Sequence, residues 1–162
     1  MKRTFASALL LSAALAAPAF ADITVNYATN GSVPRNSIKA GAEANGETLF
    51  ACTADHNGGT HPGKLRPGLH GCNFGYGGQE LTNWEYQVVG GKARWRKAAW
   101  PGDIPNGSVA LGNEANGAAL YVCRAPFNGG LHPGKIRTEF KGCNIGYGGQ
   151  ERTVFPYEVL GN

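Results

Sequence analysis

The sequence has little that points to a membrane, to nucleic acid or to a helical fold. After the N-terminal segment, no apolar run approaches the roughly 20 residues that a membrane-spanning helix needs. The formal net charge of the chain is only +4, which is too mild to indicate a nucleic-acid-binding protein. No later segment shows a sustained helical apolar period. We therefore expect no membrane insertion and no nucleic-acid partner, and a fold that is built from strands.

The N-terminal segment has the features of a secretory signal peptide. Lys2 and Arg3 precede an apolar stretch, residues 9–17. Ala19-Phe20-Ala21 then fits the small-x-small pattern of a cleavage site. We expect residues 1–21 to be removed and the mature protein to be exported, either to the periplasm or out of the cell. Removing the two basic residues lowers the net charge from +4 to +2.

The remaining chain consists of two copies of one unit. Residues 31–91 and 102–162 align without a gap at a constant offset of 71, and 32 of the 61 aligned positions are identical. Several core-type positions differ conservatively between the copies, as a hydrophobic core tolerates. We assign residues 22–91 to the first repeat and residues 92–162 to the second. A single repeat would be marginal in size, so we expect the two to share one domain.

Short β-rich runs separated by turn dipeptides predict an all-β fold with antiparallel hairpins. Residues 48–53 and 119–123 are such runs. Residues 92–100, the basic and aromatic connector between the copies, correspond to the N-terminal strand of the first copy, and we expect a strand there as well. The dipeptides that predict turns are Asn45-Gly46, Asn116-Gly117, Pro62-Gly63 and Pro133-Gly134.

Four cysteines, one pair in each repeat, predict disulfides in an exported chain. Four cysteines allow three connectivities, and all of them respect the repeat symmetry. We favour the local pairs, Cys52 with Cys72 and Cys123 with Cys143, because they would also form in an isolated repeat. Free buried thiols are the alternative. The spacing lacks the close Cys-x-x-Cys pairs that are typical of a structural zinc site.

Nothing in the sequence indicates a cofactor or a catalytic site. Gly58–Lys64 and Gly129–Lys135 superficially match a phosphate-binding loop. Each is followed by Leu or Ile where a magnesium-binding Ser or Thr is needed, and no strand-to-helix context exists, so we reject nucleotide binding. No arrangement of a nucleophile with a base stands out, and we expect no enzymatic activity.

A carboxylate and a lysine recur together in both copies. Glu43 is followed by Lys64, and Glu114 by Lys135, each lysine standing after a Pro-Gly dipeptide that predicts a turn and an exposed side chain. A carboxylate accepts hydrogen bonds from hydroxyls and an ammonium group donates three, so such a pair can hold the vicinal hydroxyls of a sugar. The alternative is a surface salt bridge worth under about 1 kcal/mol.

Two further pairs of residues are weaker candidates for the same site. Glu80 and Glu151 end the glycine-rich segments, and they either line the site or bind the amides of their loops. His61 and His132 have no Asp, Glu or His at ligand spacing, so we expect hydrogen-bonded histidines in turns and no metal. Core packing is the default expectation for the three tryptophans, and stacking on a sugar face is the alternative.

Several short motifs recur in the repeats: Gly31-Ser-Val-Pro34, Gly41-x-Glu43-x-Asn-Gly46, Leu120–Ala125, Pro62-Gly63-Lys64, Gly77-Gly78-Gln-Glu80 and Tyr157-Glu-Val-Leu160. In these motifs the repeat resembles the DM9 domain. The resemblance implies an all-β, intertwined pair of repeats and a mannose-binding lectin whose sugar site uses an acidic residue and the lysine of the Pro-Gly-Lys motif. These positions are Glu43 and Lys64, and Glu114 and Lys135. The lectins of the family carry Asp at the acidic position, so Glu is expected to alter selectivity for mannose.

The sequence therefore predicts an exported, non-catalytic protein that binds mannose-type glycans. The alternative, from a different class, is a structural or protein-interaction module of the cell envelope in which the glutamates and lysines only fasten loops. The sequence leaves open whether the chain forms a homodimer.

Overall fold

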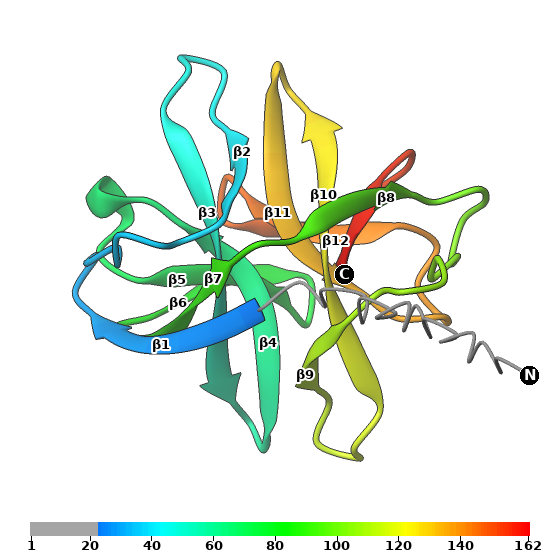
Figure 1. The fold of residues 1–162 in the computed structure, drawn as a ribbon, viewed down its shortest axis with the longest axis horizontal. Helices are drawn as coiled ribbons and strands as arrows, with labels where there is room; N and C mark the ends of the chain where they lie inside the picture. The colour runs from blue at the N-terminus through cyan, green and yellow to red at the C-terminus, as the bar shows by residue number, and fades with distance from the viewer. Residues whose placement is uncertain (1–22) are drawn as a thin grey trace, which may run out of the picture.

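Residues 23–162, the part of the chain that the computed structural model describes, form one sheet of 14 strands (Figure 1). The all-β prediction is confirmed, and every strand pairing is antiparallel. The predicted leader, residues 1–21, lies outside the described residues. The strands of the first repeat are β1 (Ile23–Thr29), β2 (Lys39–Ala42), β3 (Thr48–His56), β4 (Gly59–Leu65), β5 (Cys72–Tyr76), β6 (Gln79–Asn83) and β7 (Glu85–Gly91).

The second repeat forms its strands in the same order. The connector contains a strand, β8 (Arg94–Lys97), as the sequence predicts. A short 3-10 turn, η1 (Pro67–Leu69), interrupts the first repeat. Among residues 23–162, no helix is long and apolar enough to cross a membrane. The strands of the second repeat are β8 (Arg94–Lys97), β9 (Ala110–Asn113), β10 (Ala119–Phe127), β11 (Gly130–Ile136), β12 (Cys143–Tyr147), β13 (Gln150–Val154) and β14 (Glu158–Gly161).

The turns only partly follow the prediction. Asn45-Gly46 lies in a turn, where Gly46 has a φ of 90° and its N–H donates to the carbonyl of Glu43. The prediction for Pro62-Gly63 is wrong, because both residues lie inside β4, opposite β3. A Cβ on Gly63 would come within 2.2 Å of the carbonyl oxygen of Asn73, so glycine is needed for the close approach of β5. The same applies to Pro133-Gly134 in β11.

The tight turn between β3 and β4 is formed by a different dipeptide. Asn57 and Gly58 both have positive φ, 48° and 78°, as a two-residue type I′ hairpin requires. Asn128 and Gly129 close the β10–β11 hairpin in the same way. Asn-Gly dipeptides therefore form the tight turns of both long hairpins, and Lys64 and Lys135 lie far from these turns.

The two repeats are intertwined, as expected. Strands β2, β3 and β4 of the first repeat and β9, β10 and β11 of the second form a closed ring. The ring closes through two pairings between repeats: Ala42 lies opposite Leu131, and Thr60 lies opposite Asn113. A third pairing between repeats joins β6 to β13. Each repeat thus completes the sheet of the other.

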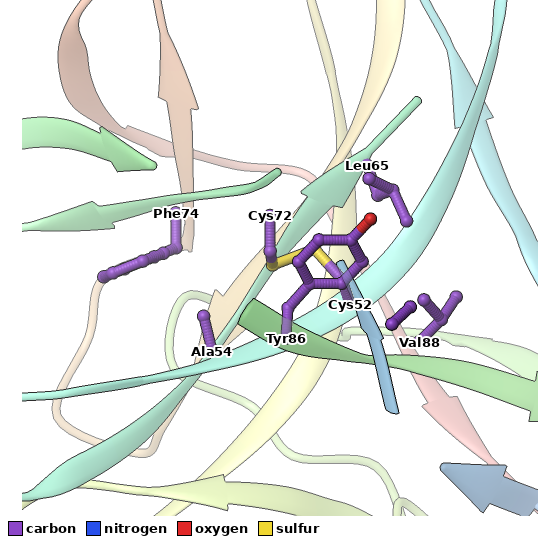
Figure 2. Close-up of a cluster of buried hydrophobic side chains, with 8 residues drawn as sticks. Cys52, Ala54, Leu65, Cys72, Phe74, Tyr86 and Val88 are labelled. Carbon is purple, nitrogen blue, oxygen red and sulfur yellow. A yellow bond between two sulfur atoms is a disulfide. The ribbon is translucent and has the colours of Figure 1, made fainter. Parts of the chain in front are cut away.

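Each repeat has its own buried cluster around one disulfide, and a third cluster lies between them. Figure 2 shows the Cys52–Cys72 disulfide among Leu65, Tyr86 and Val88. The equivalent disulfide joins Cys123 to Cys143. Both local pairings are therefore confirmed. The third cluster draws on both repeats, with Ile38, Ala40, Ala51, Val89, Val122 and Leu160.

Candidate functional site

Two equivalent pockets gather most of the predicted site residues. Each has a volume of about 510 Å³. We name them the Lys64 pocket and the Lys135 pocket. The Lys64 pocket is lined by Glu43, Lys64, Arg66, Asn73, Glu80 and Tyr147. The Lys135 pocket is lined by their counterparts, Glu114, Lys135, Arg137, Asn144, Glu151 and Tyr76.

Each pocket is completed by a tyrosine from the other repeat. The ammonium nitrogen of Lys64 lies 5.3 Å from the ring centroid of Tyr147, and that of Lys135 lies 5.3 Å from that of Tyr76. The hydroxyl of Tyr147 accepts a hydrogen bond of 2.7 Å from the side chain of Asn128, which fixes the ring. Since β12 brings Tyr147 to the Lys64 pocket, a single repeat cannot form a complete site.

Lys64 is buried and paired with Glu80, not with Glu43. Only 4% of Lys64 is exposed, so the prediction of an exposed lysine after a turn is wrong. Its Nζ lies 3.4 Å from Oε1 of Glu80. Glu80 also accepts hydrogen bonds from the side chain of Asn73, at 3.2 Å, and from the backbone N–H of Gly149, at 3.0 Å. Glu80 therefore both lines the pocket and fastens a loop of the second repeat.

Glu43 lies in the same pocket with a different partner. Its Oε1 is 3.4 Å from Nε of Arg66. Its Oε2 lies 3.9 Å from Nδ1 of His132, which is beyond hydrogen-bond distance. Within the described part of the chain, no ion pair joins Glu43 to Lys64, so the alternative of a surface salt bridge between these two residues is wrong. Glu43 keeps lone pairs that can accept hydrogen bonds from a ligand.

The Lys135 pocket repeats this arrangement with looser ion pairs. Lys135 is 2% exposed, and its Nζ lies 4.0 Å from Glu151. Glu114 is paired with Arg137 at 3.6 Å. Burial lowers the pKa of Lys135, Arg137 lowers it further, and the carboxylates of Glu151 and Glu114 act in the opposite direction. Lys135 also donates a hydrogen bond of 3.2 Å to Nδ1 of His61.

His61 is a buried strand residue that contacts the pocket of the other repeat. Its Nδ1 accepts from Lys135, and its Nε2 lies 3.2 Å from the carbonyl of His56. A lysine only donates and a carbonyl only accepts, so these partners define a neutral imidazole with its proton on Nε2. Burial and the charge of Lys135 lower the pKa of His61, in agreement with this state. The prediction of a histidine in a turn is wrong for this residue.

His132 lies in the equivalent position, in β11, without the equivalent bonds. Its side chain is fully buried, and neither ring nitrogen has a hydrogen-bond partner among residues 23–162. Burial and the charge of Lys64 lower the pKa of His132, whereas Glu43 raises it. The expectation of a hydrogen-bonded histidine in a turn is wrong here too. The two pockets thus share their main residues and differ in one contact. His61 accepts a hydrogen bond from Lys135, whereas His132 makes none with Lys64.

These two histidines should make the fold sensitive to mild acid. Their folded pKa values lie below the ordinary 6.5, so the unfolded chain binds more protons than the folded chain as the pH falls below that value. Stability should be complete above about pH 6.5 and decrease toward pH 5.5, by at most about 1.4 kcal/mol per pH unit for each histidine. Urea unfolding between pH 7.5 and 5.5 measures this slope.

A matched pair of variants assigns the pH effect. His132→Gln should flatten the slope, because it removes one of the two contributions. His70→Asn, at an exposed position with a positive φ that Asn tolerates, should leave the slope unchanged. An equal slope in wild type and His132→Gln would show that His132 is not the titrating group.

Sequence reasoning missed three residues of each pocket: an arginine, an asparagine and a tyrosine. All three are identical in the two copies, a signal that would have found them. The default expectation of core packing holds for Trp95, which packs against the third buried cluster, and is wrong for Trp84 and Trp100. Trp84 is 66% exposed and Trp100 is 62% exposed, and no tryptophan of the described chain lines either pocket. The aromatic wall is Tyr147 in the Lys64 pocket, and Tyr76 with Phe140 in the Lys135 pocket.

Comparison with known proteins identifies the family. The model of the DM9 repeat matches residues 21–83 and 76–154, so the chain belongs to the DM9 repeat family. Among solved structures, the fold is similar to that of the nematode sperm cell motility protein MFP2B, with a TM-score of 0.59 and 15% sequence identity. That match covers 86% of this chain and 44% of the other, so this chain spans less than half of that protein. No curated protein matches the sequence.

Proposed function

We propose that this protein is a carbohydrate-binding protein with one sugar site in the Lys64 pocket and one in the Lys135 pocket. One observation carries the proposal: both pockets present a carboxylate with spare acceptor capacity, a buried ammonium group and a tyrosine of the other repeat. We also propose that the protein has no enzymatic activity.

The chemistry of each pocket suits adjacent sugar hydroxyls. Glu43 can accept a hydrogen bond from one hydroxyl, while Lys64 can donate to the oxygen of its neighbour. Hydrogen bonds to charged groups are stronger than neutral ones, and the partial burial of both groups reduces screening by water. Because both groups are fixed by Arg66 and Glu80, little side-chain entropy is lost when a sugar binds.

Mannose-type glycans are the proposed ligand, on the basis of membership in the DM9 family and the resemblance of the Pro-Gly-Lys site to that of mannose-binding lectins. Export of the mature chain is proposed with it. Two buried disulfides support export, because such bonds persist mainly in oxidising compartments.

A calorimetric titration tests the proposal directly. Mannose and a high-mannose glycan should bind at two sites per chain, with millimolar to micromolar dissociation constants, corresponding to about −4 to −8 kcal/mol per site. Galactose, which differs in the orientation of its hydroxyls, serves as the control and should bind more weakly. No heat with any sugar of a broad panel would contradict the proposal.

One contact favours the alternative of a structural or interaction module. Glu80 binds the backbone N–H of Gly149, and it packs against Gly146 of the other repeat. This carboxylate therefore fastens the two repeats whether or not a sugar binds. The alternative predicts that variants of the pocket change stability and leave any sugar binding intact.

A further inference from the structure

A third pocket, found on the second repeat, is apolar and separate from both sugar sites. Its volume is about 310 Å³, and it shares no lining residue with the Lys64 or the Lys135 pocket. The hydroxyl of Tyr157 donates to the carbonyl of Asp103 at 2.8 Å, so Tyr157 adds no free polar group. The apolar walls are formed by Ala98, Pro126, Leu131, Pro156 and Tyr157.

The equivalent place on the first repeat is small and polar. It holds a volume of about 130 Å³ and is lined by Tyr27, Asp55 and Glu85, where the second repeat has Ala98, Pro126 and Pro156. The exchange of Tyr27 for Ala98 removes a large side chain, and the other two exchanges replace carboxylates with prolines. In contrast, the main residues of the two sugar pockets are identical between the copies. The repeats therefore agree at the sugar sites and differ at this one.

Three charged side chains lie in a row beside the apolar walls. Lys97 on β8 is opposite Glu158 on β14, and Glu158 is opposite Arg124 on β10. Arg124 donates a hydrogen bond of 2.7 Å to Glu158. Two cations and one anion leave a net charge of +1 at the rim of the pocket. The counterparts in the first repeat, Asn26, Gln87 and Thr53, carry no charge.

We propose that this pocket binds a small aromatic carboxylate of one or two rings. The ring would lie against the flat faces of Pro126 and Pro156 and against Leu131, and the carboxylate would lie toward Lys97 and Arg124. A cavity of about 150 Å³ holds a benzene ring, so this pocket has room for two fused rings. The mainly apolar walls with a few polar groups at one side are typical of small-molecule sites.

Calorimetry with indole-3-acetate, indole and octanoate tests the proposal. Indole-3-acetate should bind at one site per chain. Indole, which lacks the carboxylate, should bind roughly fivefold more weakly, the loss expected for an exposed ion pair. Octanoate, which has the charge without the ring, should bind more weakly than indole-3-acetate. No binding of indole-3-acetate, or equal binding of octanoate, would overturn the proposal.

Three variants place the ligand in this pocket. Ala98→Tyr copies the residue of the first repeat and should weaken binding by narrowing the pocket, since the equivalent pocket beside Tyr27 has only about 130 Å³. Pro126→Asp, at an exposed position, also copies the first repeat and should weaken binding at least tenfold by repelling the carboxylate. Lys97→Asn should weaken it roughly fivefold. Unchanged binding in either Ala98→Tyr or Pro126→Asp would overturn the assignment, so one variant still decides if the other fails to fold.

A sugar titration of the same variants separates this proposal from the proposed function. Since none of the three positions lines a sugar pocket, all three variants should keep the sugar binding of the wild-type protein. Failure of sugar binding in the wild type would count against the lectin only. Failure of indole-3-acetate binding would count against the apolar site only.

Discussion

Lys64→Met and Lys135→Met together should abolish sugar binding, and each alone should reduce the stoichiometry from two sites to one. Loss of a charged donor to a sugar hydroxyl costs about 1.5–3 kcal/mol, which weakens the affected site more than tenfold. The remaining site of each single variant should keep its affinity, because its own lysine and carboxylates are unchanged. Calorimetry with mannose measures both the stoichiometry and the affinity.

Stability should change as well, because the lysines are buried. Lys64→Met leaves Glu80 with Asn73 and Gly149 as its remaining partners, and a less satisfied buried carboxylate costs on the order of 1–3 kcal/mol. Lys39→Met, at an exposed position of β2 outside both pockets, is the matched control and should preserve stability and both sites. If the double lysine variant still bound two sugars while its melting temperature fell, the lysines would fasten the structure only.

Removing the disulfides should be the largest change to stability. Each bond joins cysteines that are 20 residues apart, and closing a loop of this length is worth about 3 kcal/mol in the chain-entropy model. Cys52→Ala with Cys72→Ala should therefore lower the free energy of unfolding by about 3 kcal/mol, and the equivalent pair in the second repeat by a similar amount. Urea unfolding measures both losses.

The fourfold cysteine variant tests whether the fold depends on both bonds. A domain of this size is typically stable by 5–15 kcal/mol, so losing both bonds should remove a large share of the total. Non-reducing peptide mapping of the wild-type protein checks the pairing itself. An unfolding free energy that was the same with and without the disulfides would contradict the prediction, as would peptides that joined the two repeats.

Turn dipeptides in the sequence predict the structure correctly where the turn requires a positive φ. Asn45-Gly46 marks a real turn, because glycine adopts its positive φ without a steric cost. Pro62-Gly63 predicts a turn that does not exist, because glycine is also required where two strands approach closely. In the structure, the carbonyl of Asn73 occupies the space that a Cβ on Gly63 would need. Local sequence does not distinguish these two reasons for a glycine.

The candidate site was predictable in composition and not in its contacts. Identity between the copies pointed to Glu43 and Lys64, and the structure places both in one pocket. The partner of Lys64 is Glu80, which β6 brings from elsewhere in the same repeat. One partner of Lys135 is His61, which comes from the other repeat. Such contacts depend on which strands are neighbours, and spacing along the chain does not report this.

The sequence by itself determined that the chain is a duplicated, strand-rich unit with one cysteine pair in each copy, because repeat identity, β-rich runs and turn residues are local properties of the chain. Only the tertiary structure decided that Ala42 lies opposite Leu131 and Thr60 opposite Asn113, which closes the ring of strands between the repeats. A strand edge offers the same backbone groups to any partner, so the choice depends on packing summed over both copies. That choice also brings Tyr147 to Lys64 and Tyr76 to Lys135, so the Lys64 pocket and the Lys135 pocket are complete only in the assembled pair of repeats.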